Sequence, residues 1–158
     1  MANDGGLIAK LEQWMADTLA AIKNSNGDAV FKKADIWKHQ VAATEGGMQA
    51  FTKYEPFAFV AYMSGDAARE GDYDLRQVLE FAVLIGVESK STGVARFGDG
   101  NNLGTSKIRE LVIDAFDKRR PSDETITCDE FYYTGEVEVF DSPKHHAIQM
   151  IFEVSQLI

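Results

Sequence analysis

The sequence predicts one α+β domain, residues 1–158, in which two principal helices pack on one face of a largely antiparallel or mixed β-sheet. Two segments repeat apolar residues at three- and four-residue steps, which is the spacing of amphipathic helices. Several others alternate apolar and polar residues, which is the spacing of half-buried strands. A chain of 158 residues suits one domain, whose folding buries roughly two-thirds of the unfolded surface.

The N-terminal third predicts a helix followed by an edge strand. The helical spacing runs from Leu7 to Ile22, and the turn-forming stretch NSNGD ends it. The next stretch, FKKADIWKHQV, alternates only partly, and we expect an edge strand there. The stretch GGMQAFTKY after it is compatible with a short helical turn.

The middle of the chain predicts two strands separated by an acidic loop. FAFVAYM is short, aromatic and bounded by Pro56, and so indicates a buried strand. Residues 79–87 alternate and predict a long central strand. Residues 64–74 between them are charged and predict a solvated loop that a partner protein orders. The candidate partner contacts in this loop are Asp66, Arg69, Glu70 and Asp72.

The last third predicts a second helix and a hairpin. Residues 108–116 have helical spacing, with basic residues 118–120 near the end and a stop at Pro121. FYYTGEVEVF and residues 148–154 alternate on either side of the turn at Ser142, and we expect them to pair. Alternation then places two carboxylates, Glu136 and Glu138, on the face opposite the apolar residues Phe131, Tyr133, Val137 and Val139.

The glycine-rich stretch FGDGNNLGTSK precedes the second helix and invites comparison with known binding loops. A Walker loop needs lysine after its last glycine, but Thr105 follows Gly104. A calcium loop needs oxygen ligands where Leu103 and Lys107 stand. We interpret the stretch as a turn in which Thr105 or Ser106 caps the helix.

No other pattern predicts a catalytic, cofactor or metal site. His145 and His146 are adjacent on an expected strand, so their side chains point to opposite faces and do not bind one ion. Cys128 is the only cysteine, carries no local signature of a nucleophile, and is interpreted as a packing residue.

The charge disfavours two classes of partner. Sixteen basic and twenty-five acidic residues give a net charge of −9, which disfavours binding to nucleic acid and to anionic membranes. The sequence contains no apolar stretch that predicts a signal peptide or a membrane span.

Four stretches of the sequence resemble the tail-terminator proteins of Mu-like bacteriophages and prophages. They are YEPFAFVAYMSG, VLEFAVLIGVES, NLGTSKIRELVIDAF and FYYTGEVEVFDSPKHHAIQMIFEV. The resemblance runs from about Leu7 to Val154 and departs from the family's pattern at residues 41–54. It implies a structural virion protein that forms a homo-oligomeric ring, most simply a hexamer. Such a ring caps the tail tube, terminates tail assembly, fixes tail length and forms part of the head-tail junction.

The resemblance also implies partners and a location. The partners are the tail tube protein and the head-tail connector protein, and the location is the virion tail, with assembly in the host cytoplasm. DNA passes through the ring without specific binding. The resemblance implies neither enzymatic activity nor a cofactor.

Several residues acquire candidate roles in such a ring. Glu136 and Glu138 are candidates for the channel face, and a solvent-exposed sheet face is the alternative. Four aromatic residues are candidates for subunit contacts, with core packing as an equal alternative: Trp37, Tyr132, Tyr133 and Phe140. Two other functions remain open, namely an adaptor of another tail-like injection machine and a small enzyme domain that binds an anion at residues 98–105.

Overall fold

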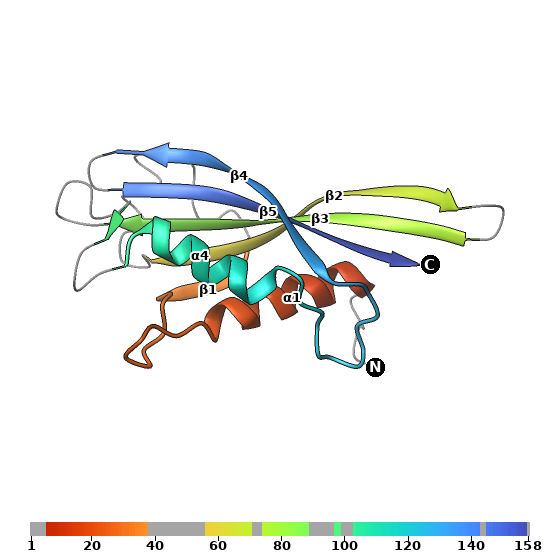
Figure 1. Ribbon diagram of the computed structural model, residues 1–158, viewed down its shortest axis with the longest axis horizontal. Helices are drawn as coiled ribbons and strands as arrows, with labels where there is room; N and C mark the ends of the chain where they lie inside the picture. The colour runs from red at the N-terminus through yellow and green to blue at the C-terminus, as the bar shows by residue number, and fades with distance from the viewer. Residues whose placement is uncertain are drawn as a thin grey trace.

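The computed structural model describes residues 6–37, 56–70, 74–88, 97–98, 103–142 and 145–157. Its five strands form one sheet in the order β1-β2-β3-β5-β4, and two helices lie across one face of it (Figure 1). This confirms the predicted α+β class. The elements in chain order are α1 (Gly6–Ala20), β1 (Lys33–Ile36), β2 (Phe57–Glu70), β3 (Asp74–Glu88), α4 (Thr105–Phe116), β4 (Phe131–Asp141) and β5 (His145–Leu157).

The pairing of the strands is mixed, as expected. β1 runs parallel to β2, while the β2–β3, β3–β5 and β4–β5 pairs are antiparallel. The long strand β3 is central and β1 is an edge strand, as the sequence predicted. Residues 41–54, where the sequence departs from the family's pattern, lie outside the described residues.

The main core lies between the helices and the sheet. Each helix buries residues spaced by four along one face, Leu11, Met15 and Leu19 from α1 and Ile108, Val112 and Phe116 from α4. Alternate residues of β3 and β5 meet them from the sheet. Aromatic rings join the two layers: the ring centroid of Trp14 lies 5.4 Å from that of Phe131 and 5.7 Å from that of Phe116.

The opposite face of the sheet carries a second, smaller apolar cluster. Phe57, Phe59 and Ala147 are buried there, and they contact the half-buried residues Trp37, Leu84, Val139 and Phe140. Gly86 lies directly under the ring of Phe57, where a Cβ atom would stand 2.2 Å from the Cζ atom of that ring. Glycine is therefore required at this position for the ring to pack against the strand.

The predicted acidic loop at residues 64–74 is wrong, because most of it forms strand. β2 continues to Glu70 and pairs with β3 as far as Asp74. Asp66, Arg69 and Glu70 therefore lie on β2, and Asp72 lies outside the described residues. The buried start of β2 fixes its register against β3, and the backbone pairing then extends into residues whose side chains remain solvated.

We call residues 62–70 of β2 and 74–80 of β3 the arm. Figure 1 shows β2 and β3 continuing past the ends of both helices, so the arm projects beyond the main core, to which it contributes Leu79 at its base. The described side chains of β2 within the arm are all exposed. The last residues of β5 pair with β3 here, with Val154 opposite Leu79 and Leu157 opposite Arg76.

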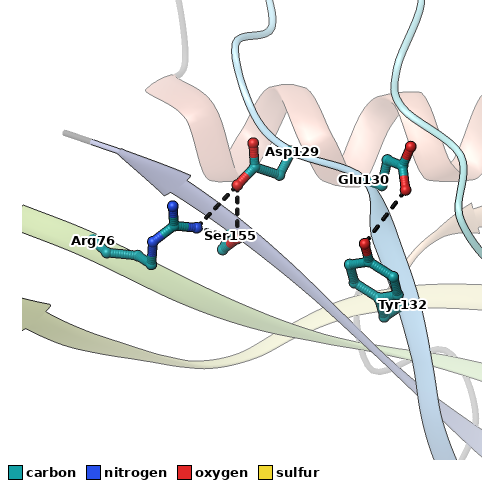
Figure 2. A network of polar contacts seen from close by, with 5 residues as sticks. All are labelled: Arg76, Asp129, Glu130, Tyr132 and Ser155. Carbon is teal, nitrogen blue, oxygen red and sulfur yellow. Dashed lines mark hydrogen bonds and ion pairs between the residues drawn. The ribbon is translucent and has the colours of Figure 1, made fainter.

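A polar network fastens the arm to the body of the protein. Figure 2 shows Asp129 between Arg76 of β3 and Ser155 of β5. The Asp129 carboxylate accepts hydrogen bonds from Ser155 Oγ at 2.9 Å and from Arg76 Nη1 at 3.0 Å. The hydrogen bond from Ser155, followed by that from Arg76, lowers the pKa of Asp129. The same figure shows Tyr132 donating to Glu130, with 3.4 Å between the oxygens.

The boundaries of α4 differ from those predicted. Gly104 is the N-cap residue and makes no side-chain cap bond, and Thr105 is already helical, so the prediction that Thr105 or Ser106 caps the helix is wrong. The helix ends at Phe116, ahead of the basic residues and of Pro121. Lys118 adopts a left-handed conformation with φ of 59°, which turns the chain away from the helix. Among the described residues, no helix is long and apolar enough to cross a membrane.

Candidate functional site

A bulge in β4 determines which side chains meet α4. The pairing with β5 slips between Tyr133 and Gly135, and Gly135 has a positive φ of 152°. One extra residue in the strand reverses the alternation from there as far as Glu138, where a second slip before Phe140 restores it. Glu136 and Glu138 therefore pair with Met150 and Ile148 of β5 and lie on the helix-covered face of the sheet. The prediction that they lie on the other face from Phe131 and Tyr133 is wrong.

Glu136 forms an ion pair with Arg109 of α4. The guanidinium donates to Glu136 Oε1, and the hydroxyl of Tyr133 donates to the same oxygen at 2.9 Å. The Arg109 guanidinium also lies over the Tyr133 ring, 5.7 Å from its centroid. The hydrogen bond to Glu136 is the main cause that raises the pKa of Arg109, while burial and then its own hydrogen bond to Glu136 raise the pKa of Tyr133.

Glu138 belongs to a second chain of polar contacts, which passes through a buried histidine. His146 is 5% exposed, its Nε2 atom lies 2.9 Å from Glu138 Oε2, and its Nδ1 atom contacts Thr105 Oγ1. An ionised carboxylate only accepts hydrogen bonds, so Nε2 of a neutral His146 donates to Glu138. Nδ1 then accepts the hydroxyl proton of Thr105, which is itself 1% exposed.

These two networks meet in a cavity of about 340 Å³ at the N-terminal end of α4. The described lining combines hydroxyl, carboxylate, guanidinium and imidazole groups with two apolar residues: Phe97, Thr105, Ser106, Arg109, Glu136, Glu138, His146 and Ile148. Two of these side chains are carboxylates and one is a guanidinium. Such a lining favours a small polar or cationic ligand over a hydrophobic one.

The histidine prediction is confirmed in its geometry. His146 faces Thr105 of α4, while the His145 ring lies 6.4 Å from the ring of Phe140, which belongs to the cluster on the opposite face. Cys128 packs against the main core, in the segment ahead of β4, and burial raises the pKa of its thiol.

The four candidate interface aromatics lie in different environments. Tyr132 is 49% exposed, while Tyr133 packs on Phe152 with their ring centroids 5.6 Å apart. Trp37 and Phe140 both border the second cluster, and Trp37 also lines a mostly apolar cavity of about 230 Å³ on that face. Their role in subunit contacts remains a prediction, and Tyr132 is the best placed of the four because of its exposure.

Sequence reasoning missed most of this site. The sequence predicts Thr105 as a helix cap or, in the alternative function, as part of the anion-binding loop at residues 98–105, and it predicts no site role for Arg109 or His146. These residues come from separate segments, and no local spacing connects them. One signal was available, because a glycine within an alternating strand, here Gly135, is typical of a bulge that re-aims the following side chains.

Neither a comparison with protein-family models nor one with curated proteins finds a match to this chain.

Proposed function

We propose that this protein is the tail terminator of a Mu-like phage or prophage, a ring-forming subunit that caps the tail tube and joins it to the head. The assignment to a phage tail rests on the four stretches of sequence that resemble the tail-terminator proteins. The observation that supports ring formation is the edge of β2: β1 pairs with Phe57 to Val60 only, and within the described residues no strand pairs with that edge in the arm. An open strand edge accepts a strand from another chain.

At the start of the arm, a hydrogen bond within the subunit occupies the edge of β2. The backbone N–H of Tyr62 donates to the carboxylate of Glu12 on α1, with a distance of 3.3 Å. Tyr62 and Met63 are 37% and 48% exposed, which places apolar surface where the arm leaves the body. Asp66 and Arg69 follow with exposed charged side chains, which limit unspecific pairing of edges.

An arm that projects from one end of the subunit suits a head-to-tail ring. In such a ring each subunit offers one surface to a neighbour and receives a different surface from the other neighbour, and rotation closes the ring. The arm is the offered surface in this proposal. A ring of six subunits with a net charge of −9 each repels DNA, which agrees with passage through the ring rather than binding.

The channel role of Glu136 and Glu138 needs revision within this proposal. Glu136 pairs with Arg109, and Glu138 contacts His146. These contacts compensate part of the negative charge that a collar around DNA requires. Glu136 and Glu138 therefore support the local packing of β4 against α4 more directly than they support a role in lining a channel.

Co-assembly with the tail tube protein of the same phage or prophage tests the proposal. We expect electron microscopy to show a ring at one end of each tube and tubes of limited length. Tubes that grow without limit, and carry no added density at either end, would contradict the proposal. A ring found at another position of a tail-like machine would instead identify the adaptor, which is the second reading of the sequence.

One observation favours the rival from a different class, a small domain that binds an anion. The cavity includes Thr105 and Ser106 at the N-terminal end of α4, where backbone N–H groups attract anions. Glu136 and Glu138 in the lining act against an anion. A rise in the melting temperature with inorganic phosphate would favour this rival, and an unchanged melting temperature would count against it.

A further inference from the structure

Three side chains at the end of the β4–β5 hairpin bring metal-binding atoms together. Glu138 and Asp141 lie on β4 and His146 lies on β5. One ligand atom from each lies within 4.8 Å of the other two. Asp141 and His146 are cross-strand partners in the β4–β5 pair, so the backbone fixes their spacing.

We propose that Glu138, Asp141 and His146 bind a divalent transition-metal ion, with zinc as the preferred ion. Zinc bonds of about 2.1 Å to nitrogen and oxygen in a tetrahedron put the ligand atoms roughly 3.4 Å apart. His146 Nε2 and Glu138 Oε2 are already 2.9 Å apart. Both carboxylates belong to exposed residues, so their rotation completes the site without movement of the backbone.

Thr105 holds the His146 ring in an orientation suited to binding zinc. A histidine that binds zinc through Nε2 carries its proton on Nδ1, and a partner of that proton fixes the ring. Thr105 Oγ1 contacts Nδ1 and, as a hydroxyl, can donate or accept. The same contact therefore holds the His146 ring both without metal, where Nδ1 accepts, and with metal, where Nδ1 donates.

The surroundings favour a cation with one coordination position left open. The described cavity lining holds the carboxylates of Glu136 and Glu138 and one guanidinium, that of Arg109, and Asp141 adds a further carboxylate beside it. Three protein ligands leave the fourth zinc position for water or a ligand oxygen. That position borders the cavity, because Glu138 and His146 are part of its lining.

Zinc titration of the untagged full-length protein tests the proposal. By calorimetry we expect one zinc ion per chain and a higher melting temperature on binding, with no comparable effect of magnesium. Asp141→Asn and Glu138→Gln should each weaken zinc binding at least tenfold. Glu124→Gln, which alters an exposed carboxylate outside the ligand group, should bind zinc as the unmodified protein does.

Thr105 gives a second test that does not remove a ligand. Thr105→Val should weaken zinc binding by about 10–100-fold, as loss of such supporting contacts typically does, and Thr105→Ser should restore it. Cobalt bound in place of zinc should show tetrahedral visible bands without a thiolate charge-transfer band, because Cys128 is not a ligand. An unmodified protein that binds no zinc, or carboxylate variants that bind it with unchanged affinity, would overturn the proposal. The outcome is independent of whether the protein caps a tail tube.

Discussion

The two halves of β2 share one strand and one partner but differ in burial. Phe57 to Val60 are almost fully buried and belong to the two apolar clusters. From Tyr62 to Arg69 the described side chains are exposed, although the pairing with β3 continues. Backbone pairing therefore accounts for the shape of the arm, while apolar burial accounts for the stability of the body. A long exposed strand contributes little to its own subunit, which is why we assign it to assembly.

The largest effect should come from truncation of a buried ring in the body. Phe152 is fully buried and its ring packs against those of Phe116 and Tyr133. Phe152→Ala should lower the free energy of unfolding by about 3–5 kcal/mol, because it leaves a cavity in the core. Asp66→Ala in the arm should change it by less than about 0.5 kcal/mol. Urea denaturation of both variants measures the difference, and equal losses would end the distinction between body and arm.

Two glycines make a matched pair for the next largest effect. A Cβ atom at Gly86 would stand 2.2 Å from the ring of Phe57, whereas at Gly65 in the arm its closest neighbours are the hydroxyl group of the exposed Tyr62 at 2.7 Å and Cδ2 of Leu79 at 3.1 Å. Gly86→Ala should cost about 1–3 kcal/mol of stability through overpacking. Gly65→Ala should cost less than about 1 kcal/mol, because a hydroxyl group and one methyl group can shift further than a packed ring.

A second variant tests the reason for the cost at Gly86. Phe57→Leu removes part of the ring that the new Cβ meets, so the double variant should lose less stability than the two single losses added together. Thermal or urea unfolding of the four proteins gives this coupling. Strict additivity would show that the contact between Phe57 and Gly86 does not explain the cost.

Charge reversal on β4 should have a smaller effect, also confined to the body. The change Glu136→Lys with Glu138→Lys removes the ion pair with Arg109 and places positive charge beside it. We expect a loss of about 1 kcal/mol, because the groups are partly exposed and solvent screens them. Val137→Lys, at a side chain that is 61% exposed between the two, is the matched control and should be near neutral. A double variant as stable as the control would show that the contacts of Glu136 and Glu138 do not stabilise the fold.

The smallest effect is expected at the junction of arm and body. Hydrogen bonds from Ser155 and Arg76 lower the pKa of Asp129, so the folded state binds its proton more weakly than the unfolded state does. This contribution is complete above the unfolded pKa of about 3.9 and is lost as the pH falls through the lower folded value. We expect it to stay below about 1 kcal/mol, because the pair is half exposed.

Replacement of the carboxylate checks this pH dependence. Asp129→Asn cannot titrate, so its free energy of unfolding should change less with pH in the acid range than that of the unmodified protein. Denaturation at a series of pH values from about 5 downward measures both slopes. Identical slopes would mean that Asp129 keeps its ordinary pKa in the folded state.

The sequence was sufficient where burial follows a simple period. Both helices, the central position of β3 and the C-terminal hairpin come directly from apolar spacing, because each of these elements buries one face. The arm could not be predicted in this way. Beyond Met63 its β2 strand, SGDAARE, has only small or charged side chains, so no apolar period marks it, and backbone pairing with β3 decides its conformation.

The candidate site was hidden for two further reasons. The bulge at Gly135 reverses the alternation on which the placement of Glu136 and Glu138 depended. The contact between Thr105 and His146 joins residues separated by 41 positions, and only the packing of α4 against β5 creates it. A glycine inside a strand indicates the bulge locally, but no local pattern predicts the contact between Thr105 and His146.

Shortening the arm tests most directly the central claim that the body folds by itself and the arm serves assembly. Ala68 and Arg76 are a cross-strand pair, so replacing residues 69–75 by Asn-Gly joins them with a two-residue turn and keeps the register. Glu124→Gln, which alters an exposed carboxylate outside the arm, serves as the control. Native mass spectrometry and electron microscopy, at high concentration and with tail tubes present, should show rings for the unmodified and control proteins. The shortened protein should remain monomeric with an unchanged unfolding midpoint, and rings formed equally well by the shortened protein would contradict the account.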